Sequence, residues 1–355
     1  GMPLSDSDIF KAQFYKFYTG KGEKDAFIKR WKELEELTEK IFHPINGTPM
    51  DELFTRYMYF VRAKMGIKSS TTEALRKFYE KDNYALLKKD STFNDMITLA
   101  HFWEDVSNQD RDRFSPRILH RLFVLNYAPN GMWTYFVSVY FMKNKDANGM
   151  LDDDAFYQFL NRITGFIWTY AVTNPGVNAL RTPVYAEMVN IVNNRPVSFD
   201  GFKFEPATVK SMFANFTFSN TRPITKSMLA WWAFQDDLQE LISLETVLEI
   251  EHIYARNRFD KDKSLSDVKN LEAIGNKALL EKRINIRAAD YRFSDKIKYY
   301  QGFTNSRNQK KEGTKNHELI NLATAADFTE DDIRNRTSQI MTAFLTFLSE
   351  NSLTK

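Results

Sequence analysis

The sequence contains no cysteine and no long uncharged apolar run, and these two absences exclude several classes of protein. Without cysteine the chain cannot form disulfide bonds or a thiolate metal site, a composition compatible with a reducing compartment. The most apolar stretch, 118–142, is interrupted by His120, Arg121, Pro129 and Asn130 and is not expected to cross a membrane. There is also no N-terminal signal of the charged-then-apolar kind. We therefore expect a cytoplasmic protein with no membrane partner.

The chain also carries little net charge, so charge alone does not indicate a nucleic-acid partner. The formal net charge is only +3 over 355 residues. Residues 251–320, however, hold 16 Lys and Arg against 10 Asp and Glu, which leaves the rest of the chain slightly acidic. A solvated basic surface is the simpler interpretation of this bias. Beside a phosphate-cleaving site, the same residues would concentrate a polyanion.

Apolar residues at helical spacing dominate the first 240 residues, for example in 27–41, 53–61 and 93–106. This pattern predicts a large helical domain over residues 1–240. The aromatic run Trp231-Trp232-Phe234 could stack on bases, but core packing is the simpler interpretation. Further elements are predicted as follows: a helix over 228–244, a strand over 246–254, a charged loop over 256–269, a helix over 277–292, a basic loop over 301–315, and a closing helix that begins at Thr329. The change from helical to strand spacing places a second domain at residues 241–355.

The predicted strand ends in a group of residues that carries chemistry. Glu251 and His252 stand side by side after alternating apolar residues, and Asn276 and Asn285 follow downstream. Neutral histidine can act as a general base, and carboxylate and amide oxygens suit a hard cation such as Mg²⁺. Neighbouring strand residues point to opposite faces, so Glu251 and His252 can converge only if a bulge or a strand end re-aims them. The grouping predicts a small metal-dependent nuclease site of the ββα-metal, HNH-like kind.

These residues resemble a known family, the GmrSD-type modification-dependent restriction endonucleases. Their C-terminal domain has the pattern Glu-His-Ile-x-Pro, Gly-Asn-Leu-x-Leu-Leu, Asn, then Phe-x-x-Lys and Tyr. The matching residues are Glu251-His252-Ile253, Gly275-Asn276, Leu279-Leu280, Asn285, Phe293, Lys296, and Tyr299 or Tyr300, with Ile333 and Arg336 on the closing helix. Two departures are visible, because Ala255 replaces the usual Pro and Lys277 the usual Leu.

The resemblance implies a fold, an activity and roles for particular residues. The fold is mainly α, with the helical domain followed by a small α+β domain of the His-Me finger (HNH) kind. His252 would be the general base and Asn276 the organiser of the catalytic loop, while Glu251 and Asn285 would bind Mg²⁺ or Mn²⁺. The activity is cleavage of DNA, modified DNA in particular, within a restriction or phage-defence enzyme. We expect the DNA-contacting residues to be basic, namely Arg256, Arg258, Lys261, Lys296, Arg307, Lys310 and Lys311.

A second segment, Gly1 to Lys11, is similar to a stretch that follows a ParB-like nucleotide-binding domain in full-length members. The Asp-Gly-Gln-Gln-Arg motif of that domain is not found in the sequence, so we expect a C-terminal fragment whose full-length form includes the ParB-like domain. Gly1 can instead be a cloning remnant before a native Met2. The alternative function is an inactive helical DNA-binding or scaffolding protein with a decayed nuclease motif, since a Glu-His pair alone is more often structural than catalytic. Ala255 is the one feature that favours decay.

Overall fold

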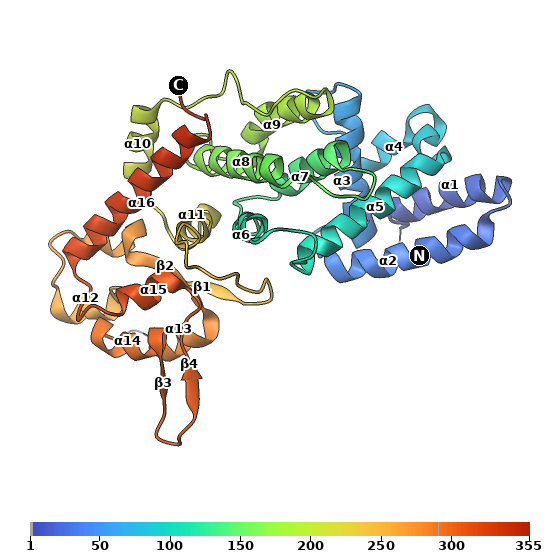
Figure 1. The fold of residues 1–355 in the computed structure, drawn as a ribbon. Helices are drawn as coiled ribbons and strands as arrows, with labels where there is room; N and C mark the ends of the chain where they lie inside the picture. Colours follow the sequence, from blue (N-terminus) through green and yellow to red (C-terminus); the bar gives the residue numbers. More distant parts are fainter. Residues whose placement is uncertain (1–2, 290) are drawn as a thin grey trace. The chain divides into compact units, whose positions relative to one another are not determined.

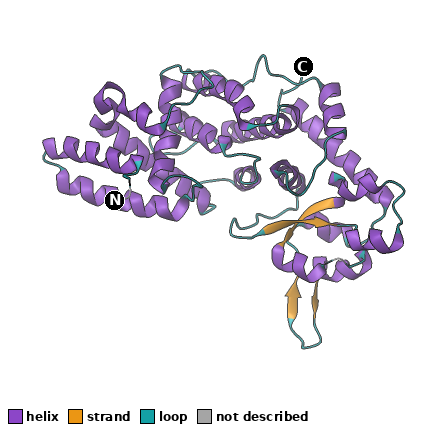
Figure 2. Ribbon diagram, turned by 180° about the vertical axis from the view of Figure 1, so that it is seen from behind, coloured by secondary structure: helices purple, strands orange, loops and turns teal. Residues whose placement is uncertain are grey.

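The structure of the protein is a computed structural model that describes residues 3–289 and 291–355. Gly1 and Met2, the first residues of the N-terminal match, lie outside the described residues. The described chain is mainly helical, with sixteen α-helices and two sheets of two strands each (Figure 2). All four strands lie after residue 247. The predicted fold class, mainly α with a small strand-containing C-terminal part, is confirmed.

The chain divides into two compact units that interleave along the sequence. Unit 1 comprises Gly1–Ser115, Gly131–Phe156 and Val177–Phe199, and unit 2 comprises Pro116–Asn130, Tyr157–Gly176 and Asp200–Lys355. The predicted division between residues 240 and 241 stays a prediction. Among the described residues, no helix is both long and apolar enough to cross a membrane.

Unit 1 is built from helices around an aromatic core. Its helices are α1 Asp6–Gly20, α2 Lys24–Ile41, α3 Pro49–Lys64, α4 Leu75–Tyr84, α5 Asp90–Ser107, α7 Met132–Asn144 and α9 Val177–Val192, with the 3₁₀ turn η1 Ala85–Lys88 (Figure 1). A capping box between Ser5 and Asp8 starts α1, because each side chain bonds the other residue's backbone N–H. Phe14 and Tyr18, four residues apart, share one face of α1, and the Tyr18 ring stacks on Phe27 of α2 at 5.1 Å. The three predicted apolar windows are therefore core faces of α2, α3 and α5.

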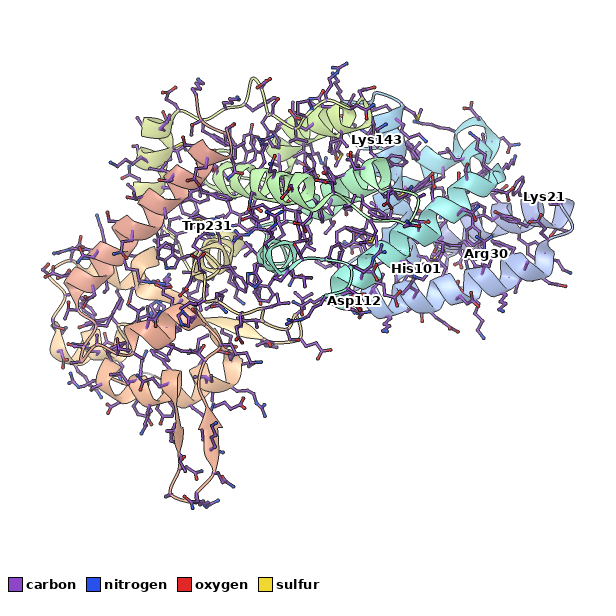
Figure 3. The ribbon with its side chains drawn as sticks, in the orientation of Figure 1. Lys21, Arg30, His101, Asp112, Lys143 and Trp231 are labelled. Atoms are coloured by element: carbon purple, nitrogen blue, oxygen red, sulfur yellow. The ribbon has the colours of Figure 1, made fainter. Side chains whose placement is uncertain are left out.

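Unit 2 holds the sequence motif. Its elements are α6 Pro116–Leu125, most of α8 Asp153–Thr173, α10 Pro206–Ala214, α11 Pro223–Ala233, β1 Leu248–His252, α12 Arg256–Asp262, η2 Val268–Glu272, η3 Ile274–Asn276, β2 Lys277–Glu281, α13 Lys282–Ala288, α14 Phe293–Gln301, β3 Gly302–Thr304, β4 Lys310–Glu312, α15 His317–Leu322 and α16 Glu330–Glu350 (Figure 1). Trp231 of α11 is fully buried and packs on Phe344 and Phe347 of α16, with ring centroids 5.1 and 5.4 Å away (Figure 3). Trp231 is thus a core residue and does not present its ring to a base.

Strands β1 and β2 pair antiparallel in a one-to-one register, and α13 follows β2 directly. The pairs run from Leu248 opposite Glu281 to His252 opposite Lys277, with no bulge. Ile253, Leu280, Ile284 and Phe293 lie in one buried apolar cluster, which fixes α13 and α14 beside the strands. The order strand, strand, helix is that of the predicted ββα unit.

Four of the predicted elements need correction. The strand prediction for 246–254 is confirmed in its central part, but the helix over 228–244 ends at Ala233. The first five residues of the helix over 277–292 are instead β2, in which the buried run Ala278-Leu279-Leu280 pairs with β1. The loop over 256–269 begins with α12, and the loop over 301–315 contains the hairpin β3–β4. Local spacing does not reveal these pairings, which join distant segments.

The turn before β2 is held against α16 by a close backbone approach. A Cβ atom at Gly275 would lie 2.3 Å from the Ile333 carbonyl oxygen and 2.2 Å from Thr337 Oγ1, so only glycine fits. Buried Arg336 donates to the carbonyls of Gly275 at 2.9 Å and Lys277 at 2.7 Å. Its Nε and Nη2 reach Glu318 at 2.6 and 3.0 Å, so the guanidinium is paired as well as hydrogen-bonded. This explains why the sequence pattern joins Gly275 to Ile333 and Arg336.

Substituting Gly275 tests this constraint. Gly275→Ala should destabilise unit 2 by about 2 kcal/mol or more, because backbone atoms of α16 must shift to admit the methyl group. Gly20→Ala is the matched control, since nothing lies within 4 Å of the Cβ position at the end of α1. Thermal unfolding combined with hydrogen exchange of β2 measures the effect. Equal melting temperatures and equal β2 protection in the two variants would contradict the close approach.

Candidate active site

Glu251 faces the apolar core of unit 2, where it is held by two buried side chains. Its Oε1 accepts hydrogen bonds from Lys296 Nζ at 2.5 Å and from Tyr300 OH at 2.6 Å. Lys296 also donates to the His252 carbonyl at 2.6 Å. Burial together with Glu251 raises the pKa of Tyr300 far above its usual value, so the phenol stays protonated as a donor. Glu251, Lys296 and Tyr300 therefore tie the end of β1 to α14.

His252 points to the other face of β1, as the alternation of a regular strand requires. Its Nε2 lies 3.3 Å from Glu272 Oε1, and its cross-strand neighbour is Lys277. Fully buried Lys277 reaches Glu272 Oε2 at 2.9 Å and the Phe218 carbonyl at 2.5 Å, while Arg256 reaches Glu272 Oε1 at 2.5 Å. Glu272 is thus the common partner of one imidazole and two cations.

The surroundings of His252 keep its ring neutral. Burial lowers the pKa of His252 to about 4, with Glu272 opposing the shift and Lys277 and Arg256 reinforcing it. A neutral imidazole carries one N–H and one free lone pair. Glu272 Oε1 lies 3.3 Å from Nε2, but Nε2 is buried and has no hydrogen-bond partner among the described residues, so either ring nitrogen can carry the hydrogen. A neutral ring is the protonation state that a general base needs at neutral pH.

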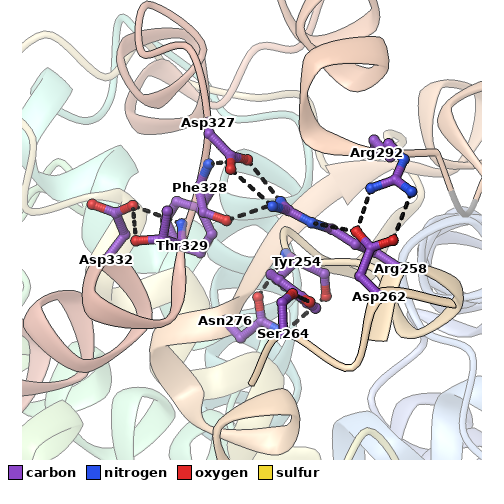
Figure 4. A network of polar contacts seen from close by, with 10 residues as sticks. All are labelled: Tyr254, Arg258, Asp262, Ser264, Asn276, Arg292, Asp327, Phe328, Thr329 and Asp332. Carbon is purple, nitrogen blue, oxygen red and sulfur yellow. Dashed lines mark hydrogen bonds and ion pairs between the residues drawn. The ribbon is translucent and has the colours of Figure 1, made fainter. Parts of the chain in front are cut away.

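Asn276 fixes the loop that follows His252. Its side chain accepts from the Tyr254 N–H at 2.7 Å and donates to the carbonyls of Tyr254 at 3.0 Å and Leu271 at 2.9 Å. The Tyr254 hydroxyl contacts Ser264, and its ring lies under the Arg258 guanidinium at 4.6 Å (Figure 4). The fully buried amide therefore satisfies backbone groups on both sides of the loop, a geometry that fits the organising role predicted for it.

Asn285 lies on α13 and contacts a carboxylate other than Glu251. Its Nδ2 donates to Glu249 Oε2 at 3.0 Å, and Glu249 Oε1 lies 3.8 Å from Lys282 Nζ. Asn285 is half-buried. Glu251 contacts Lys296, His252 lies beside Glu272, and Asn285 contacts Glu249. The convergence of Glu251, His252 and Asn285 on one cation stays a prediction.

The surroundings of the predicted metal ligands Glu251 and Asn285 show whether they could hold a divalent cation. Within residues 3–289 and 291–355 there is no cluster of three or more His, Cys, Asp or Glu that could hold a metal ion. Glu251 Oε1 already has the Lys296 ammonium at 2.5 Å, and a second cation there would be repelled. As arranged, Glu251 and Asn285 do not fit a preformed divalent site.

The predicted DNA-contacting residues fall into distinct settings. Lys296 is buried against Glu251, and its role as a DNA contact stays a prediction. Arg258 is largely buried and donates to Asp327 at 2.7 and 2.8 Å, while Asp262 joins it to Arg292 (Figure 4). Arg256 is exposed but paired with Glu272. The remaining residues, namely Lys261 on α12 and Arg307, Lys310 and Lys311 on the hairpin β3–β4, are exposed or half-buried.

Sequence reasoning missed two residues of this arrangement and misjudged a third. Glu272 lies just beyond the predicted charged loop, and Glu249 belongs to the predicted strand pattern. In the sequence Lys277 stands out only as a departure from the family's Leu, although it is the buried partner of Glu272. The available signal was the strand pairing itself, because Lys277 stands opposite His252 only in this register.

The lowered pKa of His252 predicts a pH-dependent stability. Between about pH 6.5 and pH 4 the unfolded chain binds a proton at this position and the folded protein does not. Stability should therefore fall as the pH is lowered through this window, by up to about 3 kcal/mol relative to His252→Gln. Unfolding of both proteins at several pH values, together with NMR titration of the His252 ring, measures it. A ring that titrates near pH 6.5 would show that the site is more solvated than described.

Alanine substitutions of Asn276 and Asn285 should lower the free energy of unfolding by different amounts. Asn276→Ala removes three hydrogen bonds from a buried site and should cost about 2–4 kcal/mol of unfolding free energy. Asn285→Ala removes one bond at a half-buried position and should cost less than about 1 kcal/mol. Denaturant unfolding compares the two variants, and equal losses would refute the distinction between a loop organiser and a site residue.

Comparison with known proteins gave a match to a family model. Searches of the curated proteins and of the solved structures gave no match. Residues 207–343 match the family model described as GmrSD restriction endonucleases, C-terminal domain. The matched segment includes α10, α11, the β1–β2 pair, the loop fixed by Asn276, and most of α16. Residues 207–343 of this chain are therefore similar to the C-terminal domain of GmrSD restriction endonucleases.

Proposed function

We propose that unit 2 is an endonuclease that cleaves DNA phosphodiester bonds with His252 as the general base. The observation that carries this proposal is the partly buried imidazole at the end of β1, 3.3 Å from Glu272, within a segment that matches a restriction-endonuclease family. Proton transfer from a water molecule to the unprotonated ring nitrogen would generate the attacking hydroxide, with Glu272 Oε1 3.3 Å from Nε2. Asn276 supports catalysis indirectly, by holding the loop after His252 in place.

The departure at Ala255, which argued for a decayed site, preserves the backbone that the family's proline would impose. Ala255 has φ −69° and precedes the first residue of α12. Proline fixes φ near −65°, so the backbone angle at Ala255 is one that proline adopts. The inactive alternative therefore loses its main support.

The family also suggests the setting of this activity. Modified DNA is the proposed substrate, cleaved in the cytoplasm by a restriction or phage-defence enzyme whose full-length form includes a ParB-like nucleotide-binding domain. Mg²⁺ or Mn²⁺ is the proposed cofactor, and Glu251 and Asn285 are the ligands that the resemblance implies, although as arranged they form no preformed site. Because those two side chains have other partners in this structure, the metal requirement rests on the family alone, and no catalytic step is derived through it.

Nicking of a supercoiled plasmid tests the proposal. Wild type with Mg²⁺ or Mn²⁺ should nick modified DNA, EDTA should stop the reaction, and His252→Ala should lower the rate about 100- to 10,000-fold. His101→Ala is the matched control, because His101 is exposed on α5 and pairs only locally with Glu104 (Figure 3). The melting temperature of each variant is measured alongside its rate.

Two results would count against the proposal. Nicking that survives in His252→Ala at the wild-type rate would assign the activity to another site or to a contaminant. A folded wild type that cuts neither modified nor unmodified DNA would favour the inactive alternative.

A further inference from the structure

A basic groove lies at the end of the β1–β2 pair that is remote from His252. It is a hollow of about 810 Å³ between α13, the segment before β1 and the strand β4. Its charged lining comprises Lys282, Arg283, Arg287, Lys310, Lys311 and Lys315 against Glu245, Glu281 and Glu312. The cations outnumber the carboxylates two to one, which makes the hollow attractive to an anion.

The cations of this groove are largely uncommitted. In the part of the chain that the structure describes, Arg283, Arg287, Lys310, Lys311 and Lys315 have no carboxylate within ion-pair distance. Lys282 has only the long contact of 3.8 Å to Glu249 and is 54% exposed. This contrasts with Arg256, Arg258 and Lys296, each held by a carboxylate at 2.7 Å or less. Unpaired cations around a shared hollow are free to bind an external polyanion.

The groove walls are fixed to one another before any ligand binds. Glu281, at the end of β2, accepts from Thr314 Oγ1 and from the Lys315 N–H, both at 2.6 Å. The carboxylate of Glu281 therefore joins the β2–α13 junction to the base of the hairpin β3–β4. Close backbone crossing supports this junction, since a Cβ at Gly313 would lie 2.4 Å from the Tyr300 carbonyl oxygen. A preorganised groove loses little conformational entropy on binding.

We propose that this groove binds the phosphodiester backbone of duplex DNA at a subsite separate from the cleavage centre. The inference rests on the proposed nuclease function for its choice of polyanion. Four residue steps along β1, at about 3.3 Å each, separate Leu248 beside the groove from His252, or about 13 Å. The groove therefore contacts backbone at a position separate from the cut and carries no base specificity.

Binding titrations in the His252→Ala background test the subsite without requiring cleavage. A fluorescent duplex of about 20 base pairs is titrated at several salt concentrations, with Arg283→Ala/Arg287→Ala and Lys310→Ala/Lys311→Ala compared with the parent. Each pair should weaken binding roughly 10- to 100-fold at 0.1 M salt and make the log-log salt slope shallower by about two units, equally for modified and unmodified DNA. Lys24→Ala/Lys29→Ala removes the same charge from exposed positions on α2 and should change neither quantity.

The outcomes separate this inference from the proposed function. If the groove variants retain the parent's affinity and salt slope, or if the α2 control weakens binding as much as they do, the subsite is refuted even when His252 proves catalytic. If the groove variants lose affinity as stated while wild type cuts no DNA, the subsite stands and the nuclease activity fails. Unchanged melting temperatures in the variants show that a loss of affinity is not a loss of fold.

Discussion

The close contact between the Gly275–Asn276 turn and α16 is the constraint on which the rest of the nuclease-like unit depends. Gly275 allows the two backbones to touch, and Arg336 hydrogen-bonds the turn's carbonyls while Glu318 balances its charge. This contact determines where β2 begins, and so places Lys277 opposite His252. Without it, the Asn276 amide would lose its position between Tyr254 and Leu271, and the loop after His252 would be free to move.

Because the β1–β2 pair has a regular register, the adjacent residues Glu251 and His252 point to opposite faces of β1 and have different roles. Glu251 turns into the core, where Lys296 and Tyr300 complete its hydrogen bonds, and His252 turns to the opposite face beside Glu272. Glu251 is thus a buried residue that links β1 to α14, and its sequence neighbour His252 is a candidate general base. The Lys and Tyr of the family pattern have a structural explanation, because Lys296 balances the charge of Glu251 and Tyr300 donates a hydrogen bond to its carboxylate oxygen.

Local apolar spacing in the sequence predicts many of the helices, and the elements that it predicts incorrectly have a common cause. Helices with strong apolar faces were predicted correctly, as was the start of α16, where Thr329 and Asp332 form a capping box. The element that begins at Lys277 was mistaken for a helix, because a short buried run such as Ala278-Leu279-Leu280 suits either structure until its strand partner is known. Glu272 escaped notice for the same reason: its role depends on contacts with residues far along the chain.

Charge pairing divides the basic residues of this unit into two functional kinds. Near His252, Arg256 and Lys277 share the single carboxylate of Glu272, which offsets part of their positive charge. At the other end of the same strand pair, the cations around α13 and β4 face an open hollow with few carboxylates. A count of basic residues in the sequence cannot separate these kinds, because pairing is decided by the fold. The β1–β2 pair connects them, and so sets a fixed spacing between a neutral base and an anion-attracting groove.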